Sequence, residues 1–379
     1  MTTVFLIRHT QAEGNLYRAM QGHWDGGITA LGKLQIGNLR ERMQAEHVDA
    51  VYSSDLYRAW ITAKEGVADP RGLRVITDKR LRELDMGSWE RCFFGNLQRD
   101  WPEESRLFMF DSEHWNWPGA ETFDDVRQRV YECVEEIARE NDGKSVAVIS
   151  HGVALRCFLS KVFSVDLSDV ETVPICKNTA ITRLEYENGR FTAVFKNDYS
   201  HLGAYDPPKW NSTADLSDRP LNPAEERDYY IECYREGWSF AHDGSLEDFQ
   251  PTLCLAKAEE HFAAGPLAVR KLLIHGEEAG LVELDLERGA AQKIGWISLI
   301  YLKPEYRGKG YGIQALGRGI LAYEGLGREC VRLFVNRKNT AALAFYRKYG
   351  FTPAEETDTG FIMERMLSRG RTRELQNRI

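Results

Sequence analysis

The sequence predicts an α/β protein of two domains, a three-layer α/β/α first half and an α+β second half. At 379 residues, 43% of them hydrophobic, the chain is too long for one ordinary core. In the first half, short apolar runs alternate with helical patterns, which is typical of a doubly wound parallel sheet. In the second half, three strand-like runs follow one another across tight Gly-containing turns, which favours antiparallel pairing.

Composition limits the function. The net charge is −8 with no basic stripe, so nucleic acid is not expected as a partner. No apolar run approaches the roughly 20 residues that a membrane-spanning helix needs, and the amino terminus does not resemble a signal peptide. Seven cysteines are scattered without paired spacing. We therefore expect reduced thiols and a cytoplasmic protein without disulfides or a zinc site.

The opening strand organises the first half. Val4–Ile7 is a continuous apolar run, as expected for a strand buried on both faces of a sheet. Further strands are predicted at 49–52, 74–76 and 145–150, and helices at 31–46 and 123–140. An aromatic-rich segment, 93–117, fits a core cluster and a substrate contact equally well.

Basic and imidazole groups follow three of these strands. They are Arg8 with His9, then Arg58, then His151. Ligands bind at the carboxyl ends of strands in open α/β sheets. Converging cations repel one another unless an anion lies among them, and a phosphoryl group matches the guanidinium fork. Glu83 would add a group that can donate and accept a proton.

These residues stand in recognisable motifs. They are RHTQAEGN (8–15), QGHWDGGITALG (21–32), SSDLYRA (53–59), LRELDMGSWE (81–90) and SHG (150–152), with Asn197-Asp198 and His201-Leu202 near residue 203. With them, residues 1 to about 203 resemble the histidine phosphatase superfamily, also called the phosphoglycerate mutase-like family.

The resemblance implies a metal-independent enzyme in which His9 becomes phosphohistidine. Arg8, Arg58 and His151 would hold the phosphate, Glu83 would donate the proton, and Asn15 and Gln21 would line the pocket. Thr10, Gln11 and Ala12 replace the family's Gly-Glu-Thr, which can alter the pocket wall. The short segment between Glu90 and Pro118 is closer to the phosphatases of this family than to its longer mutases.

Proline and small polar residues then mark a connection between domains. We predict a linker at 205–222, with domains at 1–204 and 223–379. Pro223 is expected to begin a helix that runs to 238, and a second helix is expected at 246–263. Strands are predicted at 267–275, 280–286, 293–302 and 331–335, and a helix at 313–324.

A Gly-rich turn, 307–312, lies between the third of these strands and that helix. Glycines let a backbone approach a ligand, and amides at a helix start bind pyrophosphate. Arg307, Gly310 and Gly312 fill the pattern Arg/Gln-x-x-Gly-x-Gly/Ala, and NTAALAFYRKYGF follows at 339–351. With these motifs, residues 223–367 resemble the GNAT N-acetyltransferase superfamily.

That resemblance implies acetyl-CoA as cosubstrate. The groups that would hold it are Leu302, Arg307, Gly308, Lys309, Gly310, Tyr311, Gly312 and Asn339. Tyr346 would protonate the departing thiolate, or it packs as an ordinary aromatic residue on its helix. Glu283 and His275 are candidates for the base.

We therefore expect a bifunctional enzyme. It would hydrolyse a small phosphomonoester and transfer an acetyl group to a small amine. One alternative is a phosphoglycerate-type mutase in the first half. Another is that one domain only senses its ligand.

Overall fold

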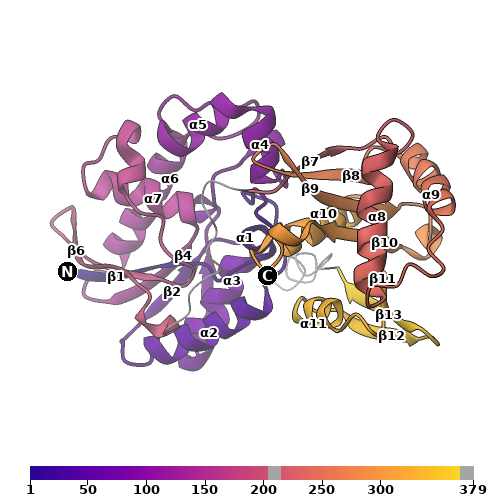
Figure 1. Ribbon diagram of the computed structural model, residues 1–379. Coiled ribbons are helices and arrows are strands. Elements are labelled where there is room, and N and C mark those ends of the chain that lie inside the picture. Colours follow the sequence, from indigo (N-terminus) through magenta and orange to yellow (C-terminus); the bar gives the residue numbers. More distant parts are fainter. Residues whose placement is uncertain (204–214, 368–379) are drawn as a thin grey trace. The chain divides into compact units, whose positions relative to one another are not determined.

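The structure is a computed structural model that describes residues 1–203 and 215–367, and these fall into two compact units. Each unit holds one sheet with helices on both faces (Figure 1). The predicted α/β/α first half and α+β second half are both confirmed. No helix in the described ranges combines the length and apolar character needed to cross a membrane.

The first sheet has six strands in the order β3-β2-β4-β1-β5-β6. Their bounds are β1 Thr2–Arg8, β2 Ala50–Ser53, β3 Val75–Thr77, β4 Ser145–Ser150, β5 Ile181–Glu187 and β6 Arg190–Asp198. Strands β1 to β4 pair in parallel, whereas β5 and β6 are antiparallel. The sequence analysis expected a wholly parallel sheet and missed this pair. In β6 exposed residues nearly alternate with less exposed ones, because this edge strand has a solvated face.

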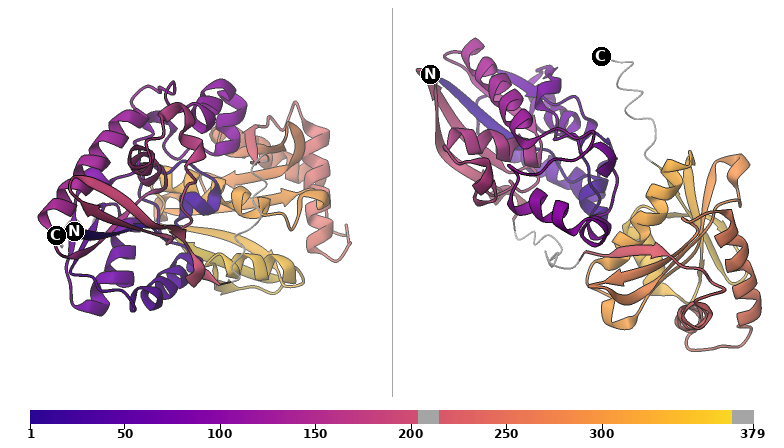
Figure 2. Two further views of the ribbon diagram at one scale, coloured as in Figure 1. Left: turned by 90° about the vertical axis from the view of Figure 1, so that its left-hand side faces the viewer. Right: turned by 90° about the horizontal axis from the view of Figure 1, so that it is seen from above.

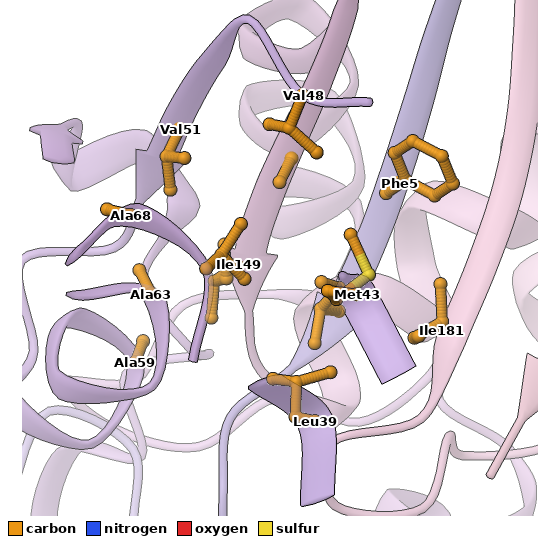
Figure 3. Packing of buried hydrophobic residues seen from close by; sticks show 13 residues of the cluster. Phe5, Leu39, Met43, Val48, Val51, Ala59, Ala63, Ala68, Ile149 and Ile181 are labelled. Atoms are coloured by element: carbon orange, nitrogen blue, oxygen red, sulfur yellow. The ribbon is translucent and has the colours of Figure 1, made fainter. Parts of the chain in front are cut away.

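Helices cover both faces of this sheet (Figure 1). They are α1 Glu13–Tyr17, α2 Ala30–Met43, α3 Tyr57–Ala63, α4 Phe94–Asp100, α5 Pro102–Phe110, α6 Phe123–Glu140 and α7 Gly152–Val162. On one face, Leu39 and Met43 of α2 pack with Phe5 and Ile149 (Figure 3). Because α6 and α7 cover the other face, Val4–Ile7 is buried on both sides, as predicted.

The aromatic segment before α6 forms a core of its own. Trp89 and Trp115 are each 1% exposed, with ring centroids 5.6 Å apart. Phe108 and Phe123 meet Trp115 edge-on at 5.1 and 5.8 Å. Of the two interpretations left open for the segment 93–117, packing therefore accounts for Phe108 and Trp115.

The second sheet has seven strands in the order β12-β13-β11-β10-β9-β8-β7. The elements are β7 Ser217–Pro220, α8 Arg227–Ala241, α9 Pro251–Ala264, β8 Val269–Ile274, β9 Glu277–Asp285, β10 Ile294–Leu302, α10 Tyr311–Gly325, β11 Cys330–Asn336, α11 Thr340–Lys348, β12 Thr352–Glu356 and β13 Gly360–Met366. Strands β8, β9 and β10 are antiparallel, as expected. Helices α8 and α9 pack on one face of the sheet and α10 on the other (Figure 2).

Part of the predicted linker is strand. Ser217–Pro220 pairs with β8 as the edge of the second sheet, where a terminal proline costs no ladder hydrogen bond. Asp218 forms ion pairs with Arg270 at 2.6 Å and Arg318 at 2.7 Å. A strand with three polar residues gives no hydrophobic signal, so composition alone suggested a connection. Residues 205–214 of that linker lie outside the described residues.

The predicted helix start at Pro223 is also wrong. Helix α8 begins at Arg227, because Asn222 first organises a turn. Its side-chain Oδ1 accepts from Ala224 N at 3.1 Å, and its carbonyl accepts from Glu226 N at 2.9 Å.

Candidate active sites

The ends of neighbouring parallel strands bring two histidines together. Strands β1 and β4 pair in register up to Arg8 and Ser150, and His9 and His151 follow directly. Their ring centroids are 5.1 Å apart, and both side chains are buried. Arg58 reaches the same place from the first turn of α3, which follows β2.

The His9 ring is oriented by its own backbone. Nδ1 lies 2.6 Å from the carbonyl oxygen of Thr10. A carbonyl can only accept, so Nδ1 carries the hydrogen and Nε2 holds the lone pair. Burial lowers the pKa of His9 well below its ordinary value, and the cations Arg58 and Arg8 lower it further. His9 is therefore neutral at pH 7 with a nucleophilic Nε2.

Several buried nitrogen atoms around the histidines have no hydrogen-bond partner in the described part of the chain. They are both ring nitrogens of His151 and the Nε groups of Arg8 and Arg58. Burial, together with Arg58 and His9, holds the pKa of His151 well below its ordinary value. Unpaired buried donors are costly, and an anion that completes the site would accept from the two arginine Nε groups and from the one N–H that a neutral His151 carries.

The remaining nitrogens of the two arginines fix their positions. Arg58 donates to Trp24 O at 3.0 Å and Gly22 O at 2.7 Å, and Asp25 lies 3.6 Å away. Arg8 donates through Nη1 to Cys176 O at 2.6 Å. Backbone carbonyls thus hold both guanidinium groups, one for Arg8 and two for Arg58, while neither Nε has a partner in the described residues.

Glu83 joins this group from the segment after β3. Its Oε1 accepts from Leu84 N at 3.0 Å and Ala154 N at 2.9 Å, and its Oε2 accepts from Val153 N at 3.1 Å. Burial lowers the pKa of both Arg8 and Arg58, and the Glu83 carboxylate opposes that shift at each. The only carboxylate among the predicted phosphate-site residues therefore lies beside the cations, at the start of α7.

The two predicted pocket-lining amides differ. Asn15 is engaged locally, because its Oδ1 accepts from Ala12 N at 3.1 Å at the start of α1. Gln21 has both amide atoms buried, and neither has a partner in residues 1–203 or 215–367. Gln21 therefore retains its hydrogen-bonding capacity for a ligand.

Glu90 organises the loop of residues 21–24, and the sequence analysis missed it. Glu90 accepts from the backbone N–H groups of Gly22, His23 and Trp24 at 3.3, 2.6 and 3.0 Å. The same loop supplies the carbonyls that hold Arg58. Glu90 stands in the quoted motif GSWE, but nothing in its spacing connects it with residues 68 positions earlier.

In the second unit, the two central strands separate at one end. Strands β10 and β11 pair in parallel only as far as Ile297 and Leu333, and the β9–β10 register shifts at Ser298. Ser298 is exposed in mid-strand, and Phe334 of β11 is 48% exposed. Beyond Ile297, β10 therefore has backbone groups on this side that β11 does not pair.

The Gly-rich turn leads from this opening into α10. Gly308 and Gly310 adopt φ of 72° and 87°, in the left-handed region that favours glycine. Gly310 caps a helix of 15 residues. A side chain at Gly312 would crowd α11, because an added Cβ would lie 3.1 Å from the Phe345 ring of that helix. Arg307 donates to Leu302 O at 2.8 Å, so its side chain closes the turn onto the end of β10.

Helix α11 carries two predicted residues. Asn339 caps it, with its Oδ1 accepting from Ala342 N at 3.0 Å. Tyr346 packs edge-on against Phe345 at 5.2 Å and Phe351 at 5.4 Å. Burial raises the pKa of Tyr346, which keeps its hydroxyl protonated. Lys309 is exposed and Tyr311 is buried at the start of α10.

Neither candidate base is supported by its position, since Glu283 is buried and already paired and His275 lies in an exposed turn. Glu283 is 2% exposed and accepts from Tyr230 OH at 2.9 Å. Its second oxygen lies 2.6 Å from His261 Nδ1. His275 is an exposed residue with φ of 52° in the turn between β8 and β9. The structure gives no reason to prefer either as a base.

The chain thus has an α/β domain with a cluster of buried basic groups, followed by an α+β domain with an opened sheet and a Gly-rich turn. The chain belongs to the histidine phosphatase superfamily, since the family model described as "Histidine phosphatase superfamily (branch 1)" matches residues 4–199. Residues 224–351 match the "Acetyltransferase (GNAT) family" and form a second domain of that family. A GNAT domain uses an acyl-CoA as cosubstrate.

Relatives of the first domain include enzymes of two kinds. Phosphoserine phosphatase 1 of Hydrogenobacter thermophilus is 30% identical over 205 residues, which is 54% of this chain and 96% of that protein. Probable phosphoglycerate mutase GpmB of an Enterobacter species is 29% identical over 209 residues, again 54% and 96%. Among solved structures, Bacillus stearothermophilus YhfR has a TM-score of 0.52 and 30% identity, covering 53% of this chain and 100% of its own.

Proposed function

We propose that the first domain is a phosphatase that acts on a small phosphomonoester through a phosphohistidine at His9. The observation that carries this proposal is the group of buried donors without partners around a neutral imidazole. Arg8, Arg58 and His151 place unpaired N–H groups where a dianion would neutralise the cations. Binding the three equatorial oxygens of the phosphoryl group is the main demand of this chemistry.

The reaction then has two steps. Nε2 of His9 attacks phosphorus in line, the ester P–O bond breaks, and the leaving oxygen takes a proton from Glu83. Water next attacks the phosphohistidine, gives its proton to Glu83 and releases inorganic phosphate. Glu83 accepts backbone N–H groups through both oxygens and lies beside the cations, which places its carboxyl group to give up this proton and take it back.

The mutase alternative uses the same phosphohistidine but returns the phosphoryl group to a second hydroxyl. The probable mutases among the relatives give it support. The phosphatase is preferred because the segment between Glu90 and Pro118 is short and fills the aromatic core. Phosphoserine and 3-phosphoglycerate are the first compounds to test. Release of phosphate identifies a phosphatase, and interconversion of phosphoglycerates identifies a mutase.

We further propose that the second domain transfers an acetyl group from acetyl-CoA to a small amine. The opening between β10 and β11 and the turn at 307–312 would receive the cosubstrate. The neutral amine attacks the thioester carbonyl, the C–S bond breaks, and the Tyr346 hydroxyl protonates the thiolate. The proton that the amine nitrogen loses on becoming an amide returns to the phenolate of Tyr346. A ligand-sensing domain would bind acetyl-CoA without consuming it, so thiol release with a panel of amines separates the two possibilities.

The phosphohistidine is the most direct test of the first proposal. The protein is mixed with an aryl phosphate, quenched in alkali, and the acid-labile phosphate is mapped by mass spectrometry. We expect the label on His9 and none in His9→Ala. His47→Ala is the matched control, because His47 is an exposed histidine whose side chain is 80% accessible. Label on another residue would refute the proposal.

A further inference from the structure

The chain makes a strained corner directly beside the end of β1. Residues 177–180 form a turn closed by Ala180 N donating to Lys177 O at 3.0 Å. Within it, Thr179 is fully buried and adopts a φ of 61°. A β-branched residue in this left-handed region is a genuine outlier, and such strain costs on the order of 1–3 kcal/mol. The surrounding contacts must hold this conformation in place.

The corner holds the backbone on either side of the Arg8–His9 bond. Thr179 N donates to Arg8 O at 3.0 Å, and Arg8 N donates to Ala180 O at 3.3 Å. The Asn178 side chain then donates through Nδ2 to His9 O at 2.9 Å. The carbonyls of both Arg8 and His9 are therefore fixed from residues 178 and 179.

The Thr179 hydroxyl explains why a strained threonine occupies the position. It donates to Asn178 O at 2.7 Å, so it must accept from Nε2 of His201, 3.1 Å away. Glycine would relieve the strain but could not make this link. Asn197 supports the corner as well, because its Oδ1 accepts from Lys177 N at 3.0 Å. The Asn197 and His201 motif residues thus act on this corner.

We propose that Asn178 and Thr179 are positioning residues that aim the imidazole of His9. The proposal rests on the proposed function of His9 as nucleophile. Asn178 fixes the peptide plane between His9 and Thr10. The ring of His9 is in turn tied to Thr10 O through Nδ1. Because the ring follows this backbone, loss of the Asn178 bond rotates Nε2 away from the in-line direction without removing any phosphate ligand.

Isosteric variants test the proposal. Asn178→Asp replaces the donor by a carboxylate of the same shape, and Thr179→Val removes the hydroxyl but keeps the β-branch. We expect phosphohistidine formation from an aryl phosphate to slow by about tenfold to 100-fold in single-turnover measurements. Binding of inorganic phosphate should change by less than about twofold, because Arg8, Arg58 and His151 remain. Thr179→Ser, which restores the hydroxyl, should recover the rate.

Asn188→Asp is the matched control, because Asn188 is an exposed residue in the turn between β5 and β6. Equal losses in rate and phosphate affinity would show that the corner is merely structural and would overturn the proposal, as would a normal rate in Asn178→Asp. The ¹⁵N spectrum of the His9 ring gives a readout that needs no turnover. We expect the Nδ1–H tautomer in the wild type and a mixture of tautomers in Asn178→Asp. If the wild type is inactive but Asn178→Asp still shifts the tautomer, the phosphatase is refuted and the positioning role is supported. If the tautomer is the same in both proteins, the positioning role is overturned.

Discussion

Glu83 is the residue whose role can be separated most sharply from simple packing. Its carboxylate accepts three backbone N–H groups, so Glu83→Gln keeps the shape but loses the transferable proton. Only a poor leaving group needs that proton. We therefore expect kcat to fall about 100-fold or more for an alkyl phosphate, and far less for a nitrophenyl ester. Steady-state kinetics with both esters measure the difference, and equal losses would assign Glu83 a structural role.

The buried histidines should make the stability of the first domain sensitive to acid. Burial and neighbouring arginines lower the pKa of His9 and of His151 in the folded protein. An unfolded histidine titrates near about 6.5, so below that pH the unfolded chain binds more protons than the folded one. Stability is therefore fully present above about pH 6.5 and is lost as the pH falls, by up to about 1.4 kcal/mol per pH unit for each group.

Urea unfolding in phosphate-free buffer at pH 7.5 and pH 5.5 measures this loss. His151→Gln should show a smaller loss than the wild type, because one of the two groups is gone. His47→Gln serves as the control, since His47 is exposed. The same acid dependence in all three proteins would contradict the assignment.

At the scale of single residues, the sequence identified the reactive groups but not the residues that hold them in position. His9 and His151 could be placed because buried strands end directly before them. Asn178 contacts the His9 carbonyl 169 positions away through one hydrogen bond, and Glu90 accepts from three N–H groups 66 to 68 positions earlier. Such contacts leave no periodic pattern, so only the folded chain shows them.

At the scale of elements, the turn at 307–312 and helix α11 should fail in different ways. Gly310 has a φ of 87°, which a β-branched residue adopts only with strain of roughly 1–2 kcal/mol. Gly310→Val should therefore weaken coenzyme A binding by about tenfold or more. Tyr346→Phe should leave binding unchanged and lower the rate of acetyl transfer, because the hydroxyl is needed only when the thiolate leaves.

Calorimetry with coenzyme A measures the first effect, and thiol release measures the second. Gly325→Ala is the control for the turn, because it lies at the end of α10 with no atom within 4 Å of an added Cβ. A wild type without coenzyme A binding at millimolar concentration would remove the acetyltransferase half of the proposal.

Elements were predictable where burial is continuous. The run Val4–Ile7 and the consecutive strands β8 to β10 have strong apolar signals and lie where expected. The polar edge strand β7 and the half-solvated β6 lack such a signal, since an edge strand needs few buried side chains. Helix starts were displaced where a local turn, such as that at Asn222, competes with the helix.

At the scale of the whole molecule, each sheet is complete within its own unit. Strands β1 to β6 pair only with one another in the described residues, and so do β7 to β13. A break in the chain between 203 and 215 would therefore leave both ladders intact, whereas the originally predicted boundary at 222 would remove β7 from its sheet. Because β7 pairs with β8, we expect a second-domain piece to need Ser217–Pro220, which lies inside the predicted linker.

We expect cleavage at a protease site introduced between 203 and 215 to yield two folded pieces. The first should keep the phosphohistidine reaction, because every group of that site lies in residues 8–201. The second piece should keep coenzyme A binding if it begins before Ser217. A second piece that begins at Pro223 should be less stable, because it lacks Asp218 and so loses the ion pairs with Arg270 and Arg318. Thermal unfolding of the two second-domain pieces side by side measures that difference. Equal midpoints would show that β7 is dispensable, and unfolding of the first piece on cleavage would show that the domains depend on each other for stability.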